Sequence, residues 1–203
     1  MRRVLPAVVI GYLLGAIPSA DIASRLSPGR SVDLRSEGSG NPGGMNALRL
    51  LSGRAGAAVI VADVGKGIVS CACGRRLAGD LGAHVAGVAA VAGHCFPVWT
   101  RFRGGKGVAT SFGQCVYTFP AFAPFDAVLA VAVARSSRLR HPALASVLVS
   151  SSAWLAVSVV WWKRDLPNLW GPRPTFALPL ANAATLLVIG SKALALLFRR
   201  ESG

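Results

Sequence analysis

The chain has 203 residues, of which 53% are hydrophobic and only 15% are charged. A soluble domain has about a quarter of its residues charged, so this composition indicates a membrane protein. The formal net charge of +14 would suggest a nucleic-acid partner in a soluble protein. Here the cations stand in short segments between apolar runs, where anionic headgroups of a lipid bilayer explain them and no nucleic acid is expected.

Five apolar stretches are long enough, or nearly so, to cross a bilayer, which takes about 20 mostly apolar residues. The first follows two arginines, as in a signal peptide, but Pro18 and Asp21 interrupt it and no clear cleavage site follows. We therefore interpret it as a retained span. The five stretches are 4–26, 55–74, 81–99, 143–162 and 176–198.

A sixth apolar stretch, 108–134, is either one long broken span or two short spans divided by Pro120 and Pro124. Seven spans with the N-terminus outside place thirteen Lys and Arg residues inside and seven outside, whereas six spans give at best eleven and nine. The positive-inside rule favours seven. We expect an all-α, polytopic helical membrane protein with a single domain over residues 1–203.

Two glycine-rich basic loops join these spans and fall on the cytoplasmic side with either number of spans. They read EGSGNPGGMNALR at 37–49 and RFRGGKG at 101–107. Glycine lets backbone N–H groups approach a ligand, and Arg and Lys supply charge for phosphate oxygens. The first loop has the G-x-G-x-x-G spacing but lacks the strand and helix of a dinucleotide fold, and the second lacks essential parts of a Walker A loop. Two interpretations of the loops remain open. Either they bind phosphate, or the glycines only make turns and the cations only orient the protein in the membrane.

Several ionisable residues lie within the spans. Asp63 and Lys66 are three residues apart on one helix face. We predict a structural pair, with a catalytic role as the alternative, because ionisable residues at such depth usually face the bundle interior. Asp21 and Arg25, four residues apart, are interpreted in the same way. His94, near the end of the third span, could hydrogen-bond a substrate or act as a base.

The four cysteines do not have the spacing of a zinc site, and we interpret them as buried thiols. The sequence shows no metal-ligand cluster and no convincing Ser/His/Asp set. Neither a metal nor a cofactor is therefore expected.

The motifs around these residues point to one family. The chain carries, in order, YLLGAIP at 12–18, VDLR at 32–35, GSGN at 38–41, DVGKG at 63–67, GHCFPV at 93–98, FRGGKGVA at 102–109 and LAS at 144–146. In this order the motifs resemble the PlsY family, bacterial integral-membrane glycerol-3-phosphate acyltransferases that use acyl phosphate. The GGKGVA string shortly after GHxxPV is specific.

The resemblance implies seven helices and an active site at the cytoplasmic face of the bacterial cell membrane. It implies transfer of a fatty acyl group from acyl phosphate to the sn-1 hydroxyl of glycerol 3-phosphate, which gives lysophosphatidic acid and phosphate. By position, the catalytic set would be Ser39, Arg49, Lys106 and His94. Substrate-binding residues would be Gly38, Gly40, Asn41, Asn46, Gly104, Gly105 and Gly107.

Three features depart from the family pattern. A hydroxyl residue of the first loop is replaced by Met45, the Ser that usually precedes Leu-Ala-Ser is Ala143, and the C-terminal HRxNIxR motif is not recognisable. A divergent or inactive paralogue with another donor or acceptor is therefore an alternative. A small transporter for an anionic solute is another, although such a protein would need inverted repeats and none is seen.

Overall fold

The structure is a computed structural model, which describes residues 3–27 and 32–201 and, from residue 196 onward, the backbone alone. Arg2 and Arg30, which entered the charge comparison, lie outside the described residues. Every regular element in the described part of the chain is a helix, as expected. These elements are α1 (Val4–Gly15), α2 (Ser19–Leu26), α3 (Gly44–Leu50), α4 (Gly53–Cys95), the short 3-10 helix η1 (Val98–Thr100), α5 (Val108–Thr118), α6 (Ala123–Ala134), α7 (Pro142–Arg164) and α8 (Ala177–Glu201).

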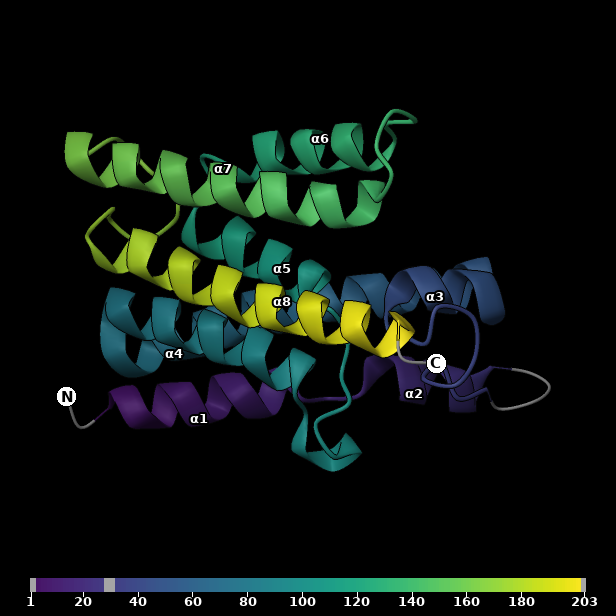
Figure 1. Cartoon of the computed structure of the whole chain (residues 1–203). Coiled ribbons are helices and arrows are strands. Elements are labelled where there is room, and N and C mark those ends of the chain that lie inside the picture. The colour runs from purple at the N-terminus through teal and green to yellow at the C-terminus, as the bar shows by residue number, and fades with distance from the viewer. Residues whose placement is uncertain (1–2, 28–31, 202–203) are drawn as a thin grey trace.

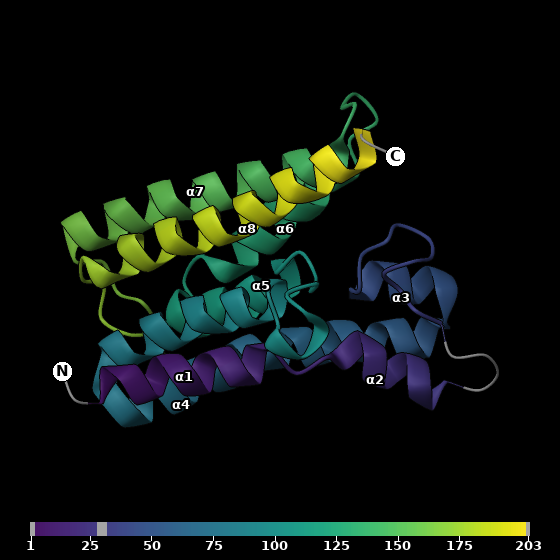
Figure 2. The same cartoon turned by 60° about the horizontal axis from the view of Figure 1, so that its bottom comes forward.

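The helices form two groups with α5 between them (Figure 1). Figure 2 shows α1, α2 and α4 on one side and α6, α7 and α8 on the other. Helix α3 packs on the first half of α4, away from the centre of the bundle. The N-terminus and the C-terminal end of α8 lie at opposite ends of the molecule.

Helix α4 consists of two helices joined at a sharp bend. Ala78 and Gly79 have non-helical backbone angles, and Gly79 has a φ of 64°. The two halves then pack closely, because Gly74 and Gly82 face each other where a Cβ on either would collide with the other's carbonyl oxygen. This bend therefore separates the predicted spans 55–74 and 81–99.

Length and composition identify four helical segments that could cross a membrane within the described residues: Val4–Leu26, Gly53–Thr100, Pro142–Arg164 and Ala177–Ala195. The second of these contains the bend of α4. The chain therefore has the apolar helices of a membrane protein.

The ambiguous stretch 108–134 forms two short helices, α5 and α6, joined by a turn at Phe119–Phe122 that contains Pro120. At about 1.5 Å per residue, the 11 residues of α5 and the 12 of α6 each reach less than 20 Å, short of the ~30 Å hydrocarbon core. The stretch is therefore divided near its prolines, which is one of the two alternatives that the sequence left open. That the chain has seven full spans stays a prediction.

Small residues let the helices of the first group approach each other. A Cβ at Gly11 or Gly15 of α1 would collide with the backbone of Ala86 or Ala90 on α4. The constant sequence offset of these pairs shows that α1 runs parallel to the second half of α4. Close approach through glycine and alanine is typical of helix packing in membranes, where apolar side chains gain little by leaving lipid.

Polar contacts align the hairpin of the second group. Ser146 donates to the carbonyl oxygen of Ala130 at 2.7 Å, and Ser150 donates to the carboxylate of Asp126. From the first pair to the second, the residue number rises by four on α7 and falls by four on α6, so the two helices are antiparallel. The loops 32–43 and 135–141 lie toward the end of the molecule opposite the N-terminus, and the loop 101–107 lies nearer the middle, beside the break between α1 and α2.

Candidate active site

The break between α1 and α2 receives a buried cation. Pro18 has no N–H and stops α1, which exposes carbonyl oxygens that the helix would otherwise use. Lys66 Nζ donates to the carbonyl oxygen of Ile17, to Ser19 Oγ at 2.9 Å and to Asp63 Oδ1 at 2.8 Å. An ammonium group has three N–H donors, so Lys66 is fully engaged in holding the protein together.

Asp63 connects this cation to His94. Its Oδ1 accepts hydrogen bonds from Ser19 Oγ and Lys66 Nζ and lies 3.6 Å from His94 Nδ1. The exposed fractions of Asp63, Lys66 and His94 are 1%, 8% and 8%. A buried carboxylate this close to Nδ1 can orient the imidazole. Ser19 and the Ile17 carbonyl were not predicted as members of this cluster, and Pro18 was the signal that could have found them.

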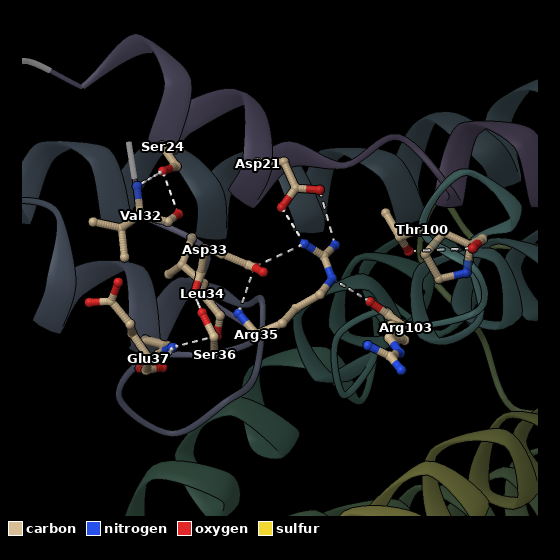
Figure 3. Close-up of polar contacts among 12 residues, drawn as sticks. Asp21, Ser24, Val32, Asp33, Leu34, Arg35, Ser36, Glu37, Thr100 and Arg103 are labelled. Carbon is tan, nitrogen blue, oxygen red and sulfur yellow. Dashed lines mark hydrogen bonds and ion pairs between the residues drawn. The ribbon is translucent and has the colours of Figure 1, made fainter. Parts of the chain in front are cut away.

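Arg35, two residues before the first Gly-rich loop, bonds to the second one, as Figure 3 shows. The guanidinium of Arg35 donates to both carboxylate oxygens of Asp21, at 2.6 and 3.0 Å, and its Nε donates to the carbonyl oxygen of Arg103 at 2.8 Å. Burial lowers the pKa of Arg35, but the hydrogen bonds and negative charge of Asp21 outweigh it, so the pKa is raised. The predicted pairing of Asp21 with Arg25 is wrong. Asp21 instead pairs with Arg35, whose planar guanidinium makes two hydrogen bonds to the carboxylate at once.

Asn46 holds the first loop in shape. Its amide nitrogen donates to the carbonyl oxygens of Leu34 and Glu37, and its amide oxygen accepts from the backbone N–H of Ser39, each at 3.0 Å. Gly38 sits inside this arrangement with a φ of 63°, and a Cβ there would collide with the Asn46 oxygen. Asn46 was predicted to bind substrate; in this structure its amide positions the loop that carries Ser39.

The second loop packs against His94. The backbone N–H groups of Gly104 and Gly105 donate to the carbonyl oxygens of Cys95 and His94. A Cβ at Gly105 would collide with His94 Nε2, so the imidazole lies directly on this glycine. His94, Gly104 and Gly105 line a small cavity of about 20 Å³ together with Lys66, Asp21 and Arg35. That volume suits a water-sized group.

A larger cavity, of about 270 Å³, lies beside the two loops. Ser39 of the first loop and Lys106 of the second both line it, and so do Arg140 and His141 at the start of α7. Its other lining residues are mostly apolar and come from α5, α7 and α8: Val108, Pro142, Ala143, Leu144, Val147, Ile189 and Ala193. The cavity thus joins a cationic rim to an apolar wall.

The remaining predicted site residues are placed as follows. Arg49 lies exposed on α3 and lines neither cavity, so the structure does not bring it together with Lys106. The amide oxygen of Asn41 is buried and finds no hydrogen-bond partner among the described residues. Gly40 has a φ of 67°, and Gly107 has a φ of 82° where it begins α5. Sequence reasoning missed Arg35, Asp21 and Arg140 as site residues.

This arrangement can bind an anion and an alkyl chain side by side. Lys106 and Arg140 provide positive charge, and Ser39 provides a hydroxyl that can donate a hydrogen bond to a phosphate oxygen. The apolar lining excludes water from one half of the cavity, which strengthens electrostatic interactions in the other half.

Comparison with known proteins places the chain in one family. A family model described as Glycerol-3-phosphate acyltransferase matches residues 5–198. The glycerol-3-phosphate acyltransferase of Thermoanaerobacter sp. (strain X514) is 38% identical over 162 residues, 80% of this chain and 79% of that protein. The one from Symbiobacterium thermophilum is 43% identical over 120 residues, so the match spans only 59% of that relative's length.

The fold is also similar to solved structures. The crystal structure of PlsY, an integral membrane glycerol 3-phosphate acyltransferase, in its glycerol 3-phosphate form gives a TM-score of 0.76 at 26% identity, over 98% of this chain and 92% of that one. A lysophosphatidic acid form of PlsY gives a TM-score of 0.75 at 25% identity with the same coverage.

Proposed function

The chain belongs to the glycerol-3-phosphate acyltransferase family, and we propose that it acylates the sn-1 hydroxyl of glycerol 3-phosphate with acyl phosphate as the donor. The whole chain would be one integral-membrane acyltransferase domain. It would lie in the bacterial cell membrane with both Gly-rich loops in the cytoplasm, where the soluble acceptor is available. Lysophosphatidic acid and phosphate would be the products.

One observation carries this proposal. Ser39 and Lys106 come from loops more than sixty residues apart and line a single cavity whose remaining wall is mostly apolar. A transfer between a polar acceptor and a donor with a long chain needs such a boundary between charge and hydrocarbon. The hydrogen bond from Arg35 to the Arg103 carbonyl keeps the two loops together.

The chemistry requires positioning and charge rather than a covalent nucleophile. Acyl phosphate is a mixed anhydride, so its carbonyl carbon is already activated. The acceptor oxygen forms the new ester bond to that carbon, the bond from carbon to the phosphate oxygen breaks, and the leaving phosphate carries away the electron pair. The hydroxyl proton passes to the leaving phosphate. The role of His94 as a base stays a prediction, because His94 lines the smaller cavity and not the larger one. Lys106 and Ser39 would stabilise the charge that develops on phosphate, and the loops would hold the reacting groups in contact.

The test is incubation of the purified protein with palmitoyl phosphate and glycerol 3-phosphate, with lysophosphatidic acid measured by mass spectrometry. Parallel reactions with acyl-CoA and acyl carrier protein thioesters identify the donor. Product formed only from the thioesters would overturn the proposed donor. No product from any donor, together with uptake of glycerol 3-phosphate into liposomes that contain the protein, would favour the transporter instead.

A further inference from the structure

Two basic residues outside the predicted set line the larger cavity. Arg140 and His141 end the segment between α6 and α7 and stand on the same cavity as Ser39 and Lys106. The cavity rim is therefore assembled from three parts of the chain that are distant in sequence. Neither residue belongs to a motif that carried the family resemblance.

The surroundings of Arg140 favour the binding of an anion. The segment 135–141 reads RSSRLRH and contains no acidic residue. Among the described residues, no acidic side chain lines this cavity, and no ion pair to Arg140 is seen. An arginine without a counter-charge attracts anionic ligands and binds phosphate oxygens through charge-assisted hydrogen bonds.

The wall beside Arg140 favours an anion that carries an alkyl chain. Leu144 and Val147 continue along α7 directly from the rim, and Ile189 of α8, whose buried cluster Val147 packs against, lines the same cavity. Glycerol 3-phosphate is polar throughout and gains nothing from such a wall, whereas an acyl phosphate has both a charged head and a hydrocarbon chain.

We infer that Arg140 recognises the phosphate of the acyl phosphate donor while the chain of the donor lies along Leu144, Val147 and Ile189. This inference rests on the proposed function, because it assigns one of its two substrates to this part of the cavity. Arg140 then selects the donor, and the acceptor binds without its help.

A matched pair of variants tests the assignment. Arg140→Ala should raise the KM for palmitoyl phosphate about tenfold or more, since a charge-assisted hydrogen bond is lost, and leave the KM for glycerol 3-phosphate within about twofold. Arg138→Ala removes the same charge from the same exposed segment but from a residue that does not line the cavity, so it should behave as wild type. Equal effects of the two variants, or a rise in the KM for glycerol 3-phosphate as large as that for the donor, would overturn the inference.

Ligand binding measured without turnover separates this inference from the proposed function. Dodecyl phosphate should raise the melting temperature of the wild-type protein and of Arg138→Ala, but not that of Arg140→Ala. That result in a protein that forms no lysophosphatidic acid would support the role of Arg140 and sink the proposed reaction alone. Equal stabilisation by inorganic phosphate, or stabilisation that depends on Arg140 with phosphatidylglycerol but not with dodecyl phosphate, would overturn the assignment to the donor.

Discussion

Lys66 Nζ donates a hydrogen bond to Asp63 Oδ1 at 2.8 Å in the interior of the bundle, where both side chains are almost fully buried. The same ammonium group also bonds Ile17 and Ser19, so the pair fixes the break between α1 and α2. His94 lies against the same carboxylate oxygen. The pair therefore couples the helical framework to the residue on which the second Gly-rich loop rests.

Replacing Lys66 by methionine should destabilise the protein strongly, because the carboxylate of Asp63 would stay buried without its cation. Breaking a buried ion pair in this way costs roughly 3–5 kcal/mol. The melting temperature and the monodisperse yield in detergent should both fall. The double variant Lys66→Met, Asp63→Leu removes both charges and should recover part of the loss. A single variant that melts like the wild type would show that the pair does not contribute to stability.

The bidentate bond between Asp21 and Arg35 should matter for turnover more than for folding. Lysine cannot reproduce the planar fork or reach the Arg103 carbonyl at the same time, so Arg35→Lys should loosen the two loops and lower kcat/KM by about tenfold. Arg25→Lys changes an exposed residue of α2 that makes no such contact and serves as the control. Equal kcat/KM values for the two variants would contradict the importance of this contact.

The all-helical membrane fold and the neighbourhood of Asp63 and Lys66 could be predicted from the sequence because both depend on local information. Hydropathy marks apolar helices, and a spacing of three residues places two side chains on one face. The pairing of Asp21 illustrates the limit. Local spacing favoured Arg25, whereas the folded chain brings Arg35 from a loop into better geometry.

The shared cavity of Ser39, Lys106 and Arg140 depends on how three segments fold back toward one end of the molecule. No spacing within one segment reports such a meeting. Family resemblance pointed to Ser39 and Lys106, but Arg140 lies outside the quoted motifs and became visible only as part of the cavity. The exposed position of Arg49 on α3 was likewise not readable from its motif.

Lys106→Ala should reduce kcat/KM by about ten- to a few hundred-fold, since one charge-assisted hydrogen bond contributes roughly 1.5–3 kcal/mol. Arg49→Ala is expected to lower kcat/KM in the same direction but less, because Arg49 does not line the cavity. Arg54→Ala, an exposed change at the start of α4, is the control and should be nearly silent. Wild-type turnover in Lys106→Ala would show that the cavity is not where the phosphate reacts.

Membrane orientation can be tested with single cysteines in a variant that lacks the four natural ones. A probe at Ser36 reports the first Gly-rich segment, and a probe at Thr175 reports the loop between α7 and α8 at the opposite end. An impermeant thiol reagent applied to intact cells should label Thr175→Cys and spare Ser36→Cys until the membrane is permeabilised. The reverse pattern would place the active site outside the cell.

Adding a single methyl group at Gly105 should impair the reaction, because its Cβ would collide with Nε2 of His94. Either the imidazole or the second loop must move, and that loop carries Lys106, which lines the cavity of the proposed transfer. We expect Gly105→Ala to lower kcat/KM by at least tenfold while the protein remains folded, since the displaced groups border a cavity rather than packed core. Gly53→Ala is the matched control, because a Cβ there meets no atom within 4 Å and alanine favours a helix over glycine by about 1 kcal/mol. Its melting temperature should equal or exceed that of the wild type, and its kcat/KM should be unchanged. If Gly105→Ala turned over as fast as Gly53→Ala, close contact between His94 and the second loop would have no part in catalysis.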